Sequence, residues 1–176
     1  MAAYQLEHIL KTQNVFVLLT YLLPTISNAE TNSGDTAWIL TSSSLVLFIT
    51  LPGLALFYEG LVQSKNLVSV LCQHFGIACL MSILWVIAGY SLAFSQGTSI
   101  LVGNLSKIFL EIAPDSKVGT IQEILLSMFQ MTFCIITPAL AIGAYVERIK
   151  FSVILIFSSV WLILVYCPVT YWVWGG

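Results

Sequence analysis

The chain has 176 residues, of which 59% are apolar and only 8% are charged. An ordinary soluble domain has about 25% charged residues, so most of the surface of this chain cannot face water. The formal net charge is -2 and no stretch gathers basic residues, which excludes nucleic acid as a partner and predicts a protein of the lipid bilayer.

The first thirty residues differ in pattern from the rest of the chain. Lys11 precedes a run of about a dozen apolar residues, and the run closes on Ser27-Asn28-Ala29, with small residues at the two positions that a signal peptidase reads. The pattern predicts a signal peptide over residues 1–29, cut after Ala29. Because Glu7 and His8 leave the start of this segment with little positive charge, an uncleaved anchor helix is the alternative.

Long, almost uncharged segments make up most of the remaining chain. Each is long enough to cross about 30 Å of hydrocarbon as a helix of roughly 20 residues. Helices are required because lipid offers no partner to free backbone N–H and C=O groups, and barrel strands would alternate in polarity. The fold is therefore predicted to be an all-α membrane protein, a polytopic transmembrane helix bundle. The predicted spans lie near residues 37–60, 67–94, 123–146 and 151–171.

The connections between the spans predict the orientation of the bundle. Two short loops together hold three basic residues, whereas the long connection and the mature N-terminus together hold two among several acidic ones. The positive-inside rule places the short loops in the cytoplasm, and a cleaved signal peptide agrees because it leaves the mature N-terminus outside. We expect a multi-pass protein of the plasma membrane, or of the inner membrane in a Gram-negative cell.

The sequence contains no pattern typical of an enzyme or a metal centre. The spans hold no nucleophile beside a base and no paired carboxylates, so we expect no enzyme activity, no catalytic residue and no cofactor. The cysteines lack CxxC spacing and are interpreted as buried small hydrophobic residues, with no metal site. They are Cys72, Cys79, Cys134 and Cys167.

Few ionisable residues lie within or beside the spans. His74 is a candidate functional residue because it is a lone histidine within a membrane span. The alternative is that it reaches interfacial water, since it lies only about two turns into the span. We expect Glu59 to extend to the cytoplasmic interface, with a substrate ligand as the alternative. Glu123 and the Glu147-Arg148 pair are interpreted as interfacial anchors that contribute little energy.

Aromatic residues gather where the fourth span is expected to leave the membrane. About twenty residues of helix from Phe151 bring the chain to the outer surface, so Tyr171, Trp172 and Trp174 are expected to emerge there. An aromatic belt is one interpretation. The other is that an indole face attracts a cation, with a stabilisation of roughly 0.5 to 2 kcal/mol. The pair Phe129-Gln130 is expected about 10 Å below the same surface.

Four blocks of this sequence, in order and spacing, resemble the first part of the Amt/MEP/Rh ammonium transporter family, on its Amt branch. The resemblance covers nearly everything from Gly34 to Gly176. The blocks read GDTAWILTSSSLVLFITLPGLALFYEGLVQSKN, SILWVIAGYSLAFS, FQMTFCIITPALAIGAYVERIKFS and WLILVYCPVTYWVWGG.

The resemblance implies a homotrimeric transporter of ammonium or ammonia, each subunit with a pore through eleven helices arranged as two inverted halves. By motif, Trp174 would be a wall of the outer recruitment site and Phe129 one half of a phenylalanine gate. Gln130, beside the gate, and Phe57 and Tyr58, toward the inner mouth, would line the pore.

The sequence also departs from the family pattern. Glu59 stands where the family usually has glycine, and Gln63 where a basic residue is usual. The second gate residue, the pore histidines and a structurally essential aspartate have no counterpart. We therefore interpret residues 30–176 as the N-terminal portion of the transporter domain, not competent alone, with Gly175 and Gly176 beginning an extracellular turn. The alternatives are an ammonium-sensing input domain of a signalling protein and a non-functional gene fragment.

Overall fold

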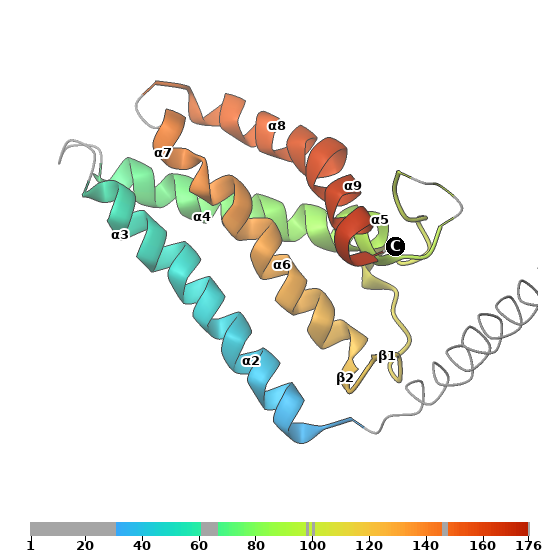
Figure 1. Ribbon diagram of the computed structural model, residues 1–176. Helices are drawn as coiled ribbons and strands as arrows, with labels where there is room; N and C mark the ends of the chain where they lie inside the picture. The colour runs from blue at the N-terminus through green and yellow to red at the C-terminus, as the bar shows by residue number, and fades with distance from the viewer. Residues whose placement is uncertain (1–30, 61–66, 98, 100, 146–147, 176) are drawn as a thin grey trace, which may run out of the picture.

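The computed structural model describes residues 31–60, 67–97, 99, 101–145 and 148–175, and in this part of the chain the helices form one bundle (Figure 1). Four helices are long and apolar enough to cross a membrane, which confirms the prediction of an all-α membrane protein. They are Ser33–Glu59, Val68–Phe94, Glu123–Tyr145 and Phe151–Trp174. The predicted signal peptide lies outside the described residues.

Each long helix is built from α-helical pieces, most of them joined by π-helical turns, which are labelled η. The first comprises α2 (Ser33–Phe48), η2 (Ile49–Gly53) and α3 (Leu54–Glu59), and the second comprises α4 (Leu67–Leu84), η4 (Trp85–Gly89) and α5 (Tyr90–Phe94). The third comprises α6 (Glu123–Leu140) and α7 (Ile142–Tyr145). The fourth comprises α8 (Phe151–Trp161), η6 (Leu162–Tyr166), α9 (Cys167–Thr170) and η7 (Tyr171–Gly175).

The connection between the second and third helices is not helical throughout. It contains a short 3-10 turn, η5 (Ile108–Leu110), and an antiparallel hairpin of two very short strands, β1 (Lys117–Val118) and β2 (Ile121–Gln122). The backbone N–H of Asn32 donates to the Thr120 carbonyl oxygen at 3.0 Å, which ties the hairpin to the start of α2. The hairpin is a small addition to the predicted all-α fold.

Local sequence explains where the first helix begins and why it changes pitch. The Asn32 side chain caps α2 by accepting hydrogen bonds from the backbone N–H groups of Gly34 and Asp35, at 2.8 and 3.3 Å. Pro52 lacks a backbone N–H and lies inside η2, where the N–H of Leu54 donates to the carbonyl of Ile49, five residues back. The π turn thus lets the helix continue past the proline.

The second long helix is the centre of the bundle. Its main segment α4 contacts α3, α6 and α8, while α2 packs on α6 (Figure 1). Gly76 allows α4 and α8 to approach closely, because a Cβ atom there would lie 2.5 Å from Cζ of Phe151. By contrast, α2 has no buried residue. The first helix therefore lies at the periphery of this bundle.

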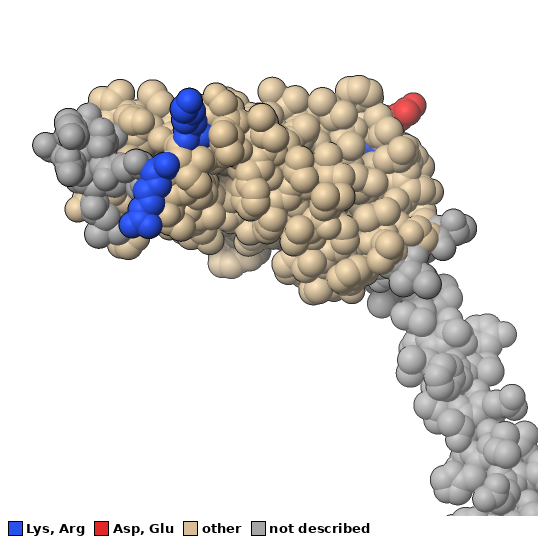
Figure 2. Space-filling model, turned by 90° about the horizontal axis from the view of Figure 1, so that it is seen from above, with Lys and Arg blue, Asp and Glu red and all other residues tan. Residues whose placement is uncertain are grey.

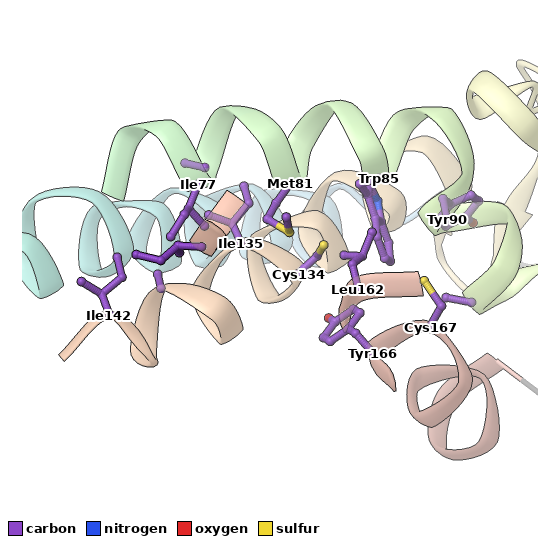
Figure 3. Packing of buried hydrophobic residues seen from close by; sticks show 14 residues of the cluster. Ile77, Met81, Trp85, Tyr90, Cys134, Ile135, Ile142, Leu162, Tyr166 and Cys167 are labelled. Atoms are coloured by element: carbon purple, nitrogen blue, oxygen red, sulfur yellow. The ribbon is translucent and has the colours of Figure 1, made fainter. Parts of the chain in front are cut away.

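The buried core runs along α4 between the third and fourth helices (Figure 3). Trp85 is its largest member, and its indole N–H donates to the Ser127 carbonyl on α6 at 3.2 Å. Rings of neighbouring segments meet Trp85 edge to face, including Tyr90 at 6.0 Å and Tyr166 at 6.3 Å between centroids. In a bilayer, hydrophobic burial does not drive helices together, because lipid is as apolar as the helix surface. Ring contacts and hydrogen bonds of this kind therefore fix the relative positions of the helices.

The bundle has two ends of different construction. We call the end with β1, β2, the start of α6 and the end of η7 the hairpin end, and the opposite end, with α3 and α7, the short-loop end. Figure 2 shows a face almost without charge, with basic side chains at the short-loop end and an acidic one at the hairpin end. An apolar belt between charged ends is the pattern of a membrane-spanning protein.

Candidate functional site

A cavity of about 520 Å³ opens at the hairpin end. Its walls combine three aromatic rings with one carboxylate and several hydroxyl, amide and ammonium groups. The residues that line it are Tyr90, Phe94, Gln96, Ser106, Lys107, Ser116, Lys117, Val118, Glu123, Leu126 and Trp174. Ring faces attract small cations, and side-chain oxygens accept hydrogen bonds from N–H donors.

Glu123, the first residue of α6, holds the walls of this cavity together. Its side chain accepts hydrogen bonds from the Tyr90 hydroxyl at 2.7 Å, from Lys107 Nζ in an ion pair and from the Ser116 hydroxyl. Its backbone N–H donates to the Ser116 carbonyl at 2.9 Å. One carboxylate thereby links the second helix, the long connection and the third helix.

The interpretation of Glu123 as an interfacial anchor is wrong, because the residue is only 3% exposed. A carboxylate can be buried when charged and neutral donors replace its water, and here three donors do so. The Lys107 Nζ atom also lies 5.9 Å from the Tyr90 ring centroid, within cation–π range. Sequence reasoning missed the cluster around Glu123, because the residues that bond to its carboxylate are scattered along the chain. Glu147, of the second expected anchor pair, lies outside the described residues.

Trp174 lines the cavity from η7 and is 62% exposed. The fourth helix is longer than predicted, because η7 keeps residues 171–175 helical. Gly175 is thus still helical, while Gly176, the other residue of the predicted turn, lies outside the described residues; Tyr171 is buried where an emerging side chain was expected. The π pitch of η7 and its packing against α5 account for the extra turn.

Phe129 is half-buried on α6, and its ring meets Phe133 edge to face at 5.0 Å between centroids. Among the described residues, neither Phe129 nor the half-buried Gln130 lines the cavity; Leu126, one turn closer to the hairpin end, does. Trp174 therefore lines the cavity, whereas Phe129, which was predicted to lie near it, does not. Phe133 is a second ring of this group that sequence reasoning missed.

At the short-loop end, Tyr58 connects three helices. Its hydroxyl donates to the Leu140 carbonyl at 2.7 Å, and its ring stacks on His74 at 5.8 Å between centroids. Gly143 makes room for that ring, because a Cβ atom there would lie 2.5 Å from Cε1 of Tyr58. Phe57 meets the edge of Tyr58 but is itself 61% exposed.

His74 is buried beneath Tyr58 and only 1% exposed. The expectation that it reaches interfacial water is wrong, because the Tyr58 ring and the neighbouring helices cover it. Its Nδ1 atom lies 2.9 Å from the Val70 carbonyl oxygen, one turn back on α4. Glu59 is half-buried at the end of α3.

The cysteines are free thiols in two different surroundings. Cys134 and Cys167 are buried in the core, as expected, but Cys72 and Cys79 are exposed on α4, so their interpretation as buried residues is wrong. In a helix this rich in apolar residues, composition does not distinguish the core face from the lipid face. Among the described residues no three His, Cys, Asp or Glu side chains gather as metal ligands would.

Comparisons with known proteins place the bundle in a family. The model of the Ammonium Transporter Family matches residues 37–176. A putative ammonium transporter of Methanothermobacter thermautotrophicus is 45% identical over 148 residues, which cover 82% of this chain and 36% of the relative. The ammonium transporter of Bacillus subtilis is 45% identical over 146 residues, covering 81% of this chain and 36% of the relative.

The fold agrees with these sequence matches. The crystal structure of Mep2 from Candida albicans superposes with a TM-score of 0.72 at 35% identity, covering 83% of this chain and 32% of that chain. The chain spans about a third of the length of the relatives that it matches. Since the family model covers most of the sequence, this multi-pass membrane protein belongs to the Ammonium Transporter Family, a class of transporters and not of enzymes.

Proposed function

We propose that residues 30–176 form the N-terminal portion of an ammonium transporter, and that the cavity at the hairpin end takes up ammonium from outside the cell. One observation carries the proposal: in a chain of this family, Trp174 lines a cavity that also contains two further rings and several side-chain oxygens. An ammonium ion fits such a cavity because it is attracted to ring faces and donates hydrogen bonds to oxygen.

The path of the substrate continues from the cavity toward the short-loop end. We assign a hydrophobic barrier below the cavity to Phe129, whose ring contacts Phe133, with Gln130 beside it on α6 as a further pore-lining residue. Phe57 and Tyr58 line the path at the opposite end. An apolar constriction favours passage of a molecule that has shed its charge, because burying an unpaired charge in a low-dielectric pathway is costly.

The complete transporter is proposed to be a homotrimer of eleven-helix subunits in the plasma membrane, or in the inner membrane of a Gram-negative cell. A signal peptide over residues 1–29 leaves the mature N-terminus outside, on the side of the hairpin end. The four helices described here cannot enclose a whole pore. We therefore expect cells that make only this chain to show no methylammonium uptake above cells without it, and saturable uptake would contradict this expectation.

Ammonium binding by the purified chain tests the site itself. In lipid nanodiscs, ammonium chloride should change the tryptophan fluorescence more than potassium chloride at the same ionic strength, because potassium has a similar size but no N–H group. Trp174→Leu should remove most of the difference. Trp38→Leu is the matched control, since Trp38 is exposed on α2 and does not line the cavity. A response that survives Trp174→Leu, or that is equal for potassium, would overturn the proposed site.

A further inference from the structure

His74 is a buried imidazole whose two ring nitrogens have different surroundings. Nδ1 lies 2.9 Å from the Val70 carbonyl oxygen, and a carbonyl oxygen can only accept a hydrogen bond, so Nδ1 carries the proton. Nε2 is fully enclosed and has no hydrogen-bond partner among the described residues. A second proton on the ring would add a buried positive charge that no described residue pairs with. The ring is therefore neutral, and Nε2 offers a lone pair.

The surroundings of Nε2 match a small donor of hydrogen bonds. The Tyr58 ring stacks on the imidazole, but its hydroxyl already donates to Leu140 and cannot serve Nε2. Buried acceptors of native proteins are nearly always paired, so a vacant one indicates a partner outside the described part of the chain, and a small bound molecule is one that can enter. The aromatic face beside it also favours an N–H donor, or a cation, over an apolar molecule.

We propose that Nε2 of His74 accepts a hydrogen bond from ammonia or ammonium at the short-loop end of the transport path. This inference rests on the proposed function, since it takes the same substrate. His74 lies outside the positions at which the family resemblance places pore histidines. The assignment therefore depends on this side chain, its fixed tautomer and its vacant nitrogen. His74 is then a substrate-binding residue near the predicted inner mouth, separate from the cavity that Trp174 lines.

The histidine ring itself provides the readout. The chain, with ¹⁵N-labelled histidine and His8→Gln so that a single histidine remains, is placed in lipid nanodiscs and titrated with ammonium chloride or potassium chloride. Before titration, ¹⁵N NMR should show a protonated Nδ1 and an unprotonated, unbonded Nε2. Ammonium should move the Nε2 resonance toward the hydrogen-bonded position and leave Nδ1 in place, whereas potassium should move neither.

Fluorescence of the same samples separates the two ways to fail. If ammonium changes the Trp174-dependent fluorescence but not the Nε2 resonance, this inference is overturned and the proposed function stands. If neither signal responds, the proposed function fails and the inference fails with it. If the Nε2 resonance lies at the hydrogen-bonded position before ammonium is added, another partner such as water already occupies the nitrogen, and the inference is overturned. A resonance that moves equally with potassium would also overturn it.

Two variants show whether the response belongs to His74 and its immediate surroundings. Gln73 is the matched control, because it is the neighbouring buried residue and its Oε1 atom also has no partner among the described residues. Gln73→Leu should leave the ammonium response of Nε2 unchanged, and loss of the response would assign the ligand to Gln73 instead. Tyr58→Leu, which removes the stacked ring, should weaken the response at least severalfold, and an unchanged response would exclude the ring from the site.

Discussion

The two ends of the bundle both bury polar side chains, but they satisfy them differently. At the hairpin end the Glu123 carboxylate accepts hydrogen bonds from three side chains, one of them cationic. At the short-loop end His74 has one bonded nitrogen and one without a partner in the described part of the chain. A buried charge that is paired holds in place the segments that supply its partners. A buried acceptor without a partner lowers the free energy of unfolding by about 1–3 kcal/mol.

The difference follows from what connects the helices at each end. The long connection 95–122 contributes Lys107 and Ser116, which reach the carboxylate from outside the helical part of the bundle. At the short-loop end the described neighbours of His74 are helical, and no described side chain donates to its Nε2 atom. The comparison indicates that the hairpin end is held by side chains, while the short-loop end depends on close packing around Tyr58. The following changes test that distinction.

The largest effect is expected from Lys107→Met. It removes the cationic partner of a buried carboxylate, and breaking such a pair costs about 3–5 kcal/mol. Because Lys107 is partly exposed and two neutral donors remain, we expect the free energy of unfolding to fall by about 3 kcal/mol, the lower limit of that range. Circular dichroism during titration of mixed micelles with sodium dodecyl sulfate measures this quantity.

Lys117→Met and a double variant complete this test. Lys117 lines the same cavity from the exposed strand β1, so its loss should change the free energy of unfolding by less than about 0.5 kcal/mol. Lys107→Met combined with Glu123→Gln should recover part of the lost stability, because a neutral amide costs less to bury than an unpaired carboxylate. Equal effects of the two lysine changes would show that the ion pair does not hold the hairpin end.

A smaller effect is expected from Gly143→Ala at the short-loop end. The added methyl group would lie 2.5 Å from Cε1 of Tyr58, so the ring or the helix must move. Overpacking of this kind usually costs about 1–3 kcal/mol, and the helix preference of alanine offsets part of it, which leaves a loss of about 1–2 kcal/mol. Gly60→Ala is the control, since its nearest contact would be an ordinary 3.4 Å. Stability unchanged by Gly143→Ala would contradict tight packing around Tyr58.

The spans could be predicted from the sequence because hydropathy is a local property of each segment. The burial of Glu123 could not, since Tyr90 lies 33 positions before it and Lys107 16 positions before it. In the sequence, Glu123 is an ordinary charge at the edge of a membrane span and Lys107 an ordinary charge of the long connection. Only the fold of the long connection brings them together.

The short-loop end shows a second limit of sequence reasoning. Hydropathy places His74 near a helix end and thus near water, but a ring from another helix covers it. In the same helix, Cys72 and Cys79 face outward while Ile77 is fully buried, although all three are apolar. In a soluble helix, polar residues would mark the outer face; in lipid both faces are apolar, and the pattern is lost.

The smallest effect is expected from Tyr58→Phe, which keeps the ring on His74 and removes only the hydroxyl bonded to Leu140 at 2.7 Å. Loss of one such hydrogen bond should lower the free energy of unfolding by about 1 kcal/mol. Tyr145→Phe is matched to it, because the Tyr145 hydroxyl donates to the Pro138 carbonyl over a longer 3.3 Å, and its loss should cost less. The reverse order would mean that the joint between α6 and α7, and not the Tyr58 ring, fixes the short-loop end.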